Sequence, residues 1–161
     1  MPKHNIRFVR IDDRLIHGQV ATTWTKVLNI EQILIIDDAA KNDPMMQSVA
    51  NFAAPPHVKV SIFGVDQFIA IQAKTEIKRA TMLLFANVLD TLKVIEAGVE
   101  VPYVNAGGMR FREGRRQMTK AISVTPEENE AFKALIQRGI DIQIQMVPKD
   151  PVEHYHDVYS D

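Results

Sequence analysis

The sequence predicts an α/β fold built on a single open, mostly parallel, twisted sheet of about seven strands with helices on both faces. Short apolar runs alternate with helical stretches along the chain, which is the pattern of a parallel sheet crossed by helices. Residues 33–36 and 82–85 are apolar at every position, as expected for central strands covered on both sides. The 161 residues contain no linker, repeat or low-complexity tract, so we expect a single domain over residues 1–161.

Each predicted strand is a short run of apolar residues. Residues 6–11 alternate apolar and basic side chains, which is typical of a strand. The later runs are separated from one another by helical stretches. In chain order the predicted strands are residues 6–11, 32–36, 58–63, 80–85, 101–104, 121–124 and 140–146.

Two of the predicted helices are placed by their start and stop signals. The pair Asp43-Pro44 predicts a helix over residues 45–53, with the aspartate as N-cap and proline at the first helical position. Asp90 predicts a helix over residues 91–97 that stops at Gly98.

The clearest helix start is Thr125, because Glu128 three residues later completes a capping box. Gly139 marks the end of that helix. A further helix is predicted over residues 20–28, where breakers are few. Trp24 has the spacing of a core residue in that helix, although a surface aromatic used in docking is the alternative.

Composition excludes several classes of protein. The chain has no cysteine, so disulfides and thiolate chemistry are excluded and a reducing compartment is allowed. A net charge of −1 gives no overall basic field, so we expect no nucleic-acid partner. The first residues carry no secretion signal, and no apolar run approaches the ~20 residues that span a bilayer. We therefore expect a cytoplasmic protein.

The loop after the first predicted strand carries the strongest functional signal. In an open α/β sheet ligands bind beyond the carboxyl ends of the strands. His17 lies in this loop just ahead of a helix, where free N–H groups and the helix dipole favour a phosphate and disfavour a protonated ring. A neutral histidine is a nucleophile, and Arg14 has a planar fork suited to phosphoryl oxygens. Gly18 permits close approach of the backbone.

Residues 10–20, Arg-Ile-Asp-Asp-Arg-Leu-Ile-His-Gly-Gln-Val, resemble the phosphohistidine loop of the IIB components of the mannose-type sugar phosphotransferase system. The resemblance continues through residues 105–110, 119–124 and the capped helix at Thr125, and ends at Val147-Pro148. It covers essentially the whole chain.

The resemblance implies a phosphotransferase that forms a phosphohistidine at His17. The phosphoryl group would come from a phosphorylated IIA protein and pass to a sugar that enters through a membrane-embedded IIC/IID complex, so the chain would associate peripherally with the membrane. Arg14 would stabilise the phosphoryl group, and Arg10 and Asp12 would organise the loop. Neither a cofactor nor a metal is implied, and the sugar and any homo-oligomer are left open.

The remaining candidates are supporting residues. Asp13, Gly18 and Gln19 belong to the histidine loop, and Asp37 follows the second strand on the same rim of the sheet. A second loop, residues 105–120, contains a glycine pair and five basic residues interrupted by a single acid. It is either a docking surface or a solvated basic loop. Its candidate residues are Asn105, Gly107, Gly108 and Arg110.

The same residues allow other interpretations. Taken without its neighbours, His17 is a histidine bonded to a backbone carbonyl. Asp12-Asp13 could be a magnesium pair as in receiver domains, but the phosphoacceptor aspartate expected after the third strand is replaced by Gly64. A nucleotide-binding flavodoxin-like module lacks its Gly-x-Gly-x-x-Gly turn here. A regulatory protein that only signals sugar supply would keep the same site.

Residues 150–161 are polar and aromatic, and they are the part of the chain least expected to pack. His154 and His156 have metal-like spacing in this segment. Because the sequence places no other ligand beside them, they are interpreted as part of a solvated terminus.

Overall fold

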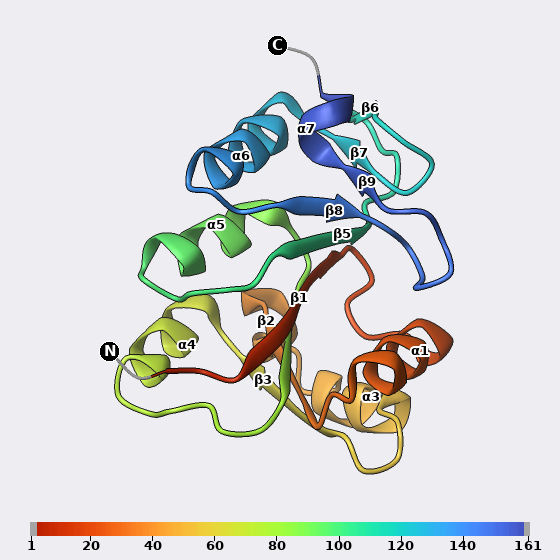
Figure 1. Cartoon of the computed structure of the whole chain (residues 1–161). Coiled ribbons are helices and arrows are strands. Elements are labelled where there is room, and N and C mark those ends of the chain that lie inside the picture. The colour runs from red at the N-terminus through yellow and green to blue at the C-terminus, as the bar shows by residue number, and fades with distance from the viewer. Residues whose placement is uncertain (1–2, 160–161) are drawn as a thin grey trace.

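The computed structural model describes residues 3–159 and confirms the predicted fold class (Figure 1). A seven-stranded sheet has the order β3-β2-β4-β1-β5-β8-β9, and every neighbouring pair is parallel except β8 and β9. The strands are β1 (Ile6–Asp12), β2 (Gln32–Ile36), β3 (Lys59–Phe63), β4 (Thr81–Phe85), β5 (Val104–Gly108), β8 (Ile142–Ile144) and β9 (Glu153–His154).

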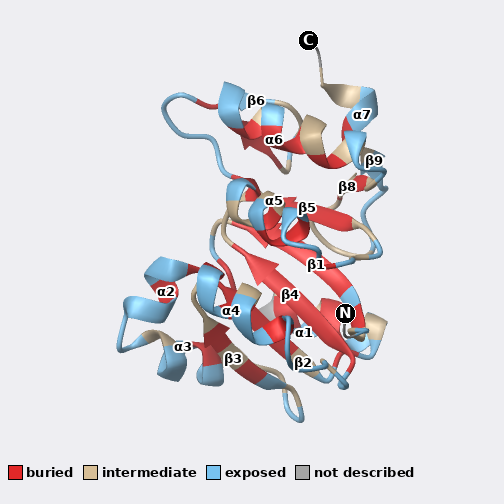
Figure 2. Ribbon diagram, turned by 90° about the vertical axis from the view of Figure 1, so that its left-hand side faces the viewer, coloured by how far each residue is buried: buried red, intermediate tan, exposed pale blue. Residues whose placement is uncertain are grey.

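Helices cover both faces of this sheet, and each face has its own apolar core (Figures 1 and 2). Trp24 of one helix and Phe8 of β1 belong to the first core, and Phe132 belongs to the second. The first face carries α1 (Gly18–Leu28), α2 (Asp38–Asn42) and α3 (Met46–Ala53); the second carries α4 (Val65–Gln72), α5 (Val88–Glu96), α6 (Pro126–Gln137) and the short α7 (Tyr155–Val158).

Strand alternation sends the polar residues of β1 to the α1 face. Val9 and Ile11 pack in the second core, so Phe8, Arg10 and Asp12 point the other way. Both polar residues are almost fully buried. A buried charge needs a partner, so this strand must carry a polar network into the interior.

The carboxyl end of β1 lies where the direction of the strand order changes. From β1 the chain continues to β2, which lies on one side of β1 in the sheet. From β5, the neighbour of β1 on the other side, the chain continues to β8, still farther in that opposite direction. Such switch points are where open α/β sheets bind ligands. Asp12 at the end of β1 is paired in register with Gly108 at the end of β5, so the loops that follow these two strands start side by side.

Two strand predictions were wrong in position. The predicted strand 101–104 is β5, which runs four residues further, through Asn-Ala-Gly-Gly. Glycine is a poor strand former, but at these two positions the fold requires residues without side chains, because groups of the site occupy that space. The predicted strand 121–124 is β7 (Ser123–Val124), and it pairs with β6 (Arg116–Gln117) in a separate antiparallel hairpin, outside the main sheet.

Helix starts were predicted with mixed success. The capping box is confirmed: the Thr125 hydroxyl accepts the Glu128 N–H at 3.0 Å, and Glu128 Oε1 accepts the Thr125 N–H at 2.8 Å. The helix predicted from residue 91 starts three residues earlier, because Asn87 is the N-cap and Asp90 lies in the first turn.

The helix predicted over residues 45–53 is α3 (Met46–Ala53), and its predicted cap was also wrong. Asp43 accepts the Met45 N–H at 3.0 Å and thereby forms the turn that precedes the helix. Both predicted helix stops are consistent with the backbone, since Gly98 and Gly139 have φ of 104° and 87°, values that favour glycine.

The C-terminal segment packs onto the sheet, contrary to the expectation of a solvated terminus. β9 pairs with β8, and Tyr155 at the start of α7 is completely buried against Phe132, with ring centroids 4.5 Å apart. Residues 160–161 lie outside the described residues. Within residues 3–159, no helix combines the length and apolar character needed to cross a membrane.

Candidate functional site

The loop between β1 and α1 places His17 directly beside Asp12. His17 is the N-cap residue of α1, and its Nε2 lies 2.9 Å from Oδ2 of Asp12 at the end of β1. A carboxylate only accepts, so Nε2 is the ring nitrogen that carries the proton. In the neutral ring, Nδ1 then holds the free lone pair. The His17 side chain is about one quarter exposed, so a partner can reach it.

Asp12 is itself held by two arginines. Arg10 Nη2 donates to Oδ2 at 3.0 Å, and the Arg14 N–H donates to Oδ1 at 3.0 Å. The Arg14 side chain is about half exposed and its Nε lies 3.8 Å from Oδ1, at the edge of an ion pair. The guanidinium of Arg14 therefore lies next to the carboxylate that contacts His17, with free surface toward solvent.

The turn between Asp12 and His17 is backbone-strained. Leu15 has φ of 55°, in the left-handed region that residues with a side chain rarely adopt. Its N–H donates to the Asp12 carbonyl at 2.9 Å, and its side chain is buried in the core under α1. These contacts hold the strained turn and fix the direction in which His17 enters the helix.

Arg10 is the buried centre of a network that joins three segments. Its Nη1 donates to Asn105 Oδ1 of β5 at 2.8 Å and to the carbonyl of Met146, which follows β8, at 3.1 Å. Trp24 of α1 donates to the same carbonyl at 3.0 Å, and its ring centroid lies 5.8 Å from Arg10 Cζ. Burial lowers the pKa of Arg10, and the neighbouring Asp12 carboxylate opposes that shift. Through Arg10, the network holds the Asp12 carboxylate in place from the interior of the protein.

The glycine pair at the end of β5 makes room for this network. A Cβ built on Gly107 would lie 2.1 Å from Nη1 of Arg10, and one on Gly108 would lie 3.1 Å from Oδ1 of Asp12. Side chains at these positions would displace the guanidinium or crowd the carboxylate. The glycines therefore act through the space they leave for Arg10 and Asp12.

The basic stretch within residues 105–120, for which the sequence left a docking surface and a solvated loop as alternatives, divides into buried and exposed residues. Arg115 is buried and bridges two carboxylates: its Nη1 lies 3.0 Å from Asp13 Oδ2, and its Nη2 lies 2.9 Å from Glu128 Oε2. Burial lowers the pKa of Arg115, but the hydrogen bonds to Glu128 and Asp13 outweigh it and raise that pKa. For Arg115 the docking interpretation is wrong. Arg110 and Arg112 are exposed and lie within 4.0 Å of Asp13.

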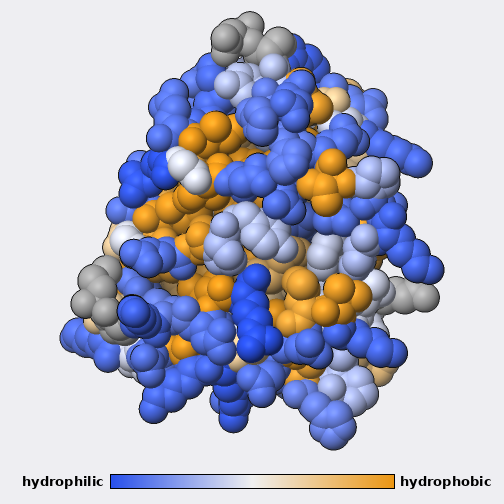
Figure 3. Space-filling view, viewed as in Figure 1, coloured by the Kyte–Doolittle hydropathy of each residue, from blue (hydrophilic) through white to orange (hydrophobic). Residues whose placement is uncertain are grey.

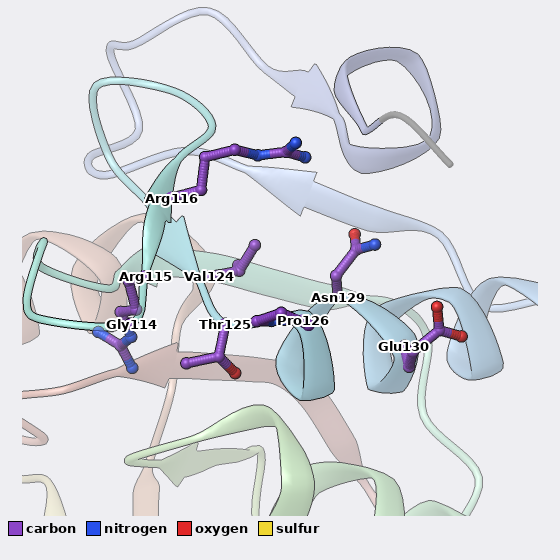
Figure 4. Close-up of a pocket in the computed structure, with 8 residues that line it drawn as sticks. All are labelled: Gly114, Arg115, Arg116, Val124, Thr125, Pro126, Asn129 and Glu130. Carbon is purple, nitrogen blue, oxygen red and sulfur yellow. The ribbon is translucent and has the colours of Figure 1, made fainter.

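Arg115 also lines a pocket of about 450 Å³ between the β6–β7 hairpin and the start of α6 (Figure 4). The residues around this pocket include Thr125 and Asn129, and none of them belongs to the histidine loop. Arg115 therefore connects the wall of that pocket to Asp13, the neighbour of Asp12.

The other candidates from the sequence have separate roles. Asp37 is the N-cap of α2, where it accepts the Ala40 N–H at 2.9 Å, so its carboxylate is used to start that helix. Gly18 is the first residue of α1, with open space around its Cα. Gln19 lies in the first turn of α1, but its side chain is outside the described part of the structure.

The sequence named Asn105, Gly107 and Gly108 as candidates, and the structure places them beside Arg10 and Asp12, but the sequence missed other partners from distant segments. Trp24 was correctly predicted as core, but its N–H bond beside Arg10 was not foreseen. Nothing in the sequence paired Arg115 with Asp13. In the sequence, the buried Arg115 cannot be told apart from the exposed arginines around it, because only the β6–β7 hairpin brings it into the interior.

The arrangement can support nucleophilic attack by His17 on phosphorus. Asp12 orients the ring by accepting a hydrogen bond from its Nε2–H group, so the lone pair on Nδ1 is available. In the described part of the chain the His17 side chain makes no capping bond to α1, so the first N–H groups of the helix are left for an anion.

Known proteins are similar to this chain along nearly its whole length. A family model described as "PTS system sorbose subfamily IIB component" matches residues 6–160. The chain is 38% identical over 147 residues to the sorbose-specific EIIB component of Klebsiella pneumoniae, covering 91% of this chain and 90% of that protein. It is 39% identical to the fructose-specific EIIB component of Bacillus subtilis, covering 94% and 93%.

One relative is larger. The mannose-specific EIIAB component of Escherichia coli is 39% identical over 156 residues, which are 96% of this chain and 48% of that protein. Among solved structures, the IIBSor domain of the Klebsiella pneumoniae sorbose permease matches with a TM-score of 0.86 at 35% identity, covering 98% of this chain and 95% of that one. The N-acetylgalactosamine-specific IIB component 1 of Escherichia coli has the same TM-score at 30% identity, covering 92% and 97%.

Proposed function

Since the chain belongs to the sorbose subfamily of phosphotransferase-system IIB components, we propose that it carries a phosphoryl group on His17 from a phosphorylated IIA protein to a sugar. The observation that carries this proposal is the 2.9 Å contact between His17 Nε2 and Asp12 at the switch point of the sheet. The fused mannose-specific EIIAB relative supports a IIA partner.

We propose Nδ1 of His17 as the attacking atom. Its lone pair forms the new N–P bond while the bond from phosphorus to the donor's histidine nitrogen breaks and its electron pair returns to that nitrogen. The Nε2 proton stays hydrogen-bonded to Asp12 throughout, which stabilises the positive charge that the ring acquires. In the second step a sugar hydroxyl oxygen forms the P–O bond, the N–P bond breaks with its electron pair returning to Nδ1, and the hydroxyl proton passes to solvent.

Charge on the phosphoryl oxygens would be balanced by groups next to His17. The N–H groups at the start of α1 and the half-exposed guanidinium of Arg14 supply donors on that side. Phosphoryl transfer depends on positioning and on stabilising the three equatorial oxygens, so these donors are the main contribution of the protein. Arg10 is buried and bonded to Asp12, Asn105 and Met146, so its role is to position Asp12.

The sugar is proposed only as a class. The relatives are named for sorbose, fructose, mannose and N-acetylgalactosamine, all of them hexoses or amino derivatives of hexoses. We propose that a membrane-embedded IIC/IID complex presents the sugar and that the chain docks on the cytoplasmic side of that complex. Phosphorylation that signals sugar supply without transfer is the alternative, and the second step distinguishes the two.

The first step is tested by intact mass after incubation with a phosphoenolpyruvate-driven relay that ends in phospho-IIA. We expect one added phosphoryl group that is lost in acid, as a phosphohistidine is, and no addition to His17→Ala. His57→Ala is the matched control, because His57 is exposed in a turn outside this loop. Phosphorylation of His17→Ala, or an acid-stable product, contradicts the proposal.

The second step is tested by adding membranes that contain IIC/IID and a panel of hexoses and amino sugars. We expect the phosphoryl group to leave His17 for at least one sugar. A phosphoprotein that keeps its phosphoryl group with every sugar in the panel contradicts transfer and favours the signalling alternative.

A further inference from the structure

A second cluster of chemically active side chains lies on the outer edge of the sheet, where β9 and α7 pack beside β8. Asp141, His154 and His156 each offer a metal-ligand atom, and these atoms lie within 4.8 Å of one another. Nδ1 of His154 is 2.8 Å from Oδ1 of Asp141, and the two histidine rings have centroids 5.6 Å apart. All three side chains are partly exposed, so an ion has access from solvent.

The backbone that carries the two histidines is fixed. Tyr155 between them is completely buried, stacks on Phe132 and Tyr159, and donates a hydrogen bond to Asn129. His154 is also paired with Gln143 in the antiparallel ladder of β8 and β9. Tyr155 is buried between the half-buried His154 and the exposed His156, so both imidazoles are held at the surface of a packed segment, which reduces the entropy lost when they bind an ion.

Asp141 is prepared as an anionic ligand. Its Oδ2 accepts a hydrogen bond from Gln143 at 3.0 Å, while Oδ1 faces His154. Asp157 Oδ1 lies 3.1 Å from Nε2 of His156 and orients that ring, as outer-shell carboxylates orient metal-binding histidines.

We propose that Asp141, His154 and His156 bind a divalent transition-metal ion, with Zn²⁺ as the best fit to two imidazoles and one carboxylate. Zn²⁺ binds such ligands at about 2.0–2.2 Å in tetrahedral geometry, so neighbouring ligand atoms lie about 3.4 Å apart. The ion takes the place of the proton between His154 Nδ1 and Asp141; that proton passes to solvent while the ring takes its proton on Nε2 and stays neutral. The exposed His156 side chain moves inward by about an ångström to complete the set. Water fills the fourth position.

This site is distinct from the phosphoryl site. Asp141 precedes β8 and its carbonyl accepts the N–H of Val104 at the start of β5, whereas Asp12 and His17 lie beside Gly108 at the end of β5. An ion bound here joins the C-terminal segment to β8 and stabilises the folded chain by mass action. It is not part of the phosphoryl transfer.

The test is a titration of the untagged chain with Zn²⁺, followed by calorimetry and by thermal unfolding, with Co²⁺ as a spectroscopic substitute. We expect one ion per chain, a rise in the melting temperature, and weaker binding as pH falls because protons compete for the imidazoles. Asp141→Asn, His154→Gln and His156→Gln should each weaken binding about tenfold or more, since even outer-shell changes cost 10–100-fold. His57→Gln should bind like the unchanged chain.

Equal Zn²⁺ binding by the triple variant Asp141→Asn/His154→Gln/His156→Gln overturns the proposal, as does binding that disappears only in His17→Ala. Circular dichroism without metal verifies that the variants are folded. Because the site is separate from His17, the triple variant should still accept a phosphoryl group, so failure of one proposal leaves the other intact.

Discussion

At the scale of single residues, Asp12 has two tasks. Its carboxylate accepts hydrogen bonds from Arg10 and from His17 at the same oxygen, Oδ2, and from the Arg14 N–H at the other. It balances the buried positive charge of Arg10, and it determines which ring nitrogen of His17 carries the proton. Both tasks need an acceptor with full negative charge, so stability and reactivity depend on one side chain.

Asp12→Asn should lower the rate of His17 phosphorylation by about 10²- to 10⁴-fold, as in other histidines that lose an orienting aspartate. Either orientation of the amide places a donor against a donor, at Arg14 N–H or at Arg10 and His17. The rate is measured by rapid quench with excess phospho-IIA and normalised to folded protein.

The matched control is Asn105→Ala, which removes a contact of Arg10 but none of His17. It should destabilise the fold while lowering the phosphorylation rate much less than Asp12→Asn does. Equal rate losses in the two variants would remove Asp12 from the chemistry and leave it a structural role.

Gly107→Ala should destabilise the chain by at least 1–3 kcal/mol, the usual effect of overpacking, because the new Cβ would meet Arg10. Urea denaturation measures this difference. Gly18→Ala is the control, since no atom lies within 4 Å of its Cβ position and alanine favours a helix. A Gly107→Ala variant as stable as Gly18→Ala would contradict the packing argument.

At this scale the sequence predicted the local part of the site, and from the distant part only Asn105, Gly107 and Gly108 as candidates, without their contacts. His17, Arg14, Arg10 and Asp12 are close along the chain, and the strand-to-helix transition is visible in the residue pattern. Their supports are Asn105, Met146 and Trp24, which meet Arg10 only because β5 and β8 take particular registers. Register depends on the whole sheet, so a linear reading could not give these contacts.

At the scale of elements, the start of α6 also anchors the histidine loop. Glu128 closes the capping box with Thr125 and also pairs with Arg115, which in turn holds Asp13 next to Asp12. The capping box was predictable because its signal lies within four residues. The strand β5 was misplaced because Gly107 and Gly108 are poor strand formers that the sheet accepts for the space they leave.

Glu128→Gln should reduce stability more than Thr125→Ala does. Thr125→Ala removes one cap and costs about 1 kcal/mol. Glu128→Gln weakens the cap and leaves the buried Arg115 with one carboxylate instead of two, so we expect about 2–3 kcal/mol. The free energy of unfolding of both variants is measured by urea denaturation. A smaller loss of stability for Glu128→Gln than for Thr125→Ala would mean that Asp13 alone is a sufficient partner for Arg115.

At the scale of the whole molecule, charge is distributed unevenly although the chain is nearly neutral. The side chains of Arg14, Arg110 and Arg112 are 47%, 70% and 65% exposed beside the histidine loop, while the net charge is −1. A local positive surface accelerates the encounter with an anionic partner without raising the total charge. A phosphorylated IIA protein presents such an anion at its histidine.

Transfer from phospho-IIA should therefore slow as salt is added, and Arg112→Ala should lower the second-order rate several-fold and flatten its salt dependence. The second-order rate is measured by stopped-flow mixing at 20–500 mM NaCl. Over this range the Debye length falls from about 20 Å to about 4 Å. Lys74→Ala is the control, because Lys74 follows α4 at the opposite end of the sheet. Identical salt slopes for both variants would contradict steering by this surface.

The contact between Gly107 and Arg10 has a consequence for evolution. A side chain at position 107 requires a smaller residue at position 10, and a smaller residue there leaves Asp12 without its cation. Neither position can change first without loss. Descendants of this chain should therefore keep both residues or exchange both together, and positions 10 and 107 should co-vary across the lineage although 97 residues separate them.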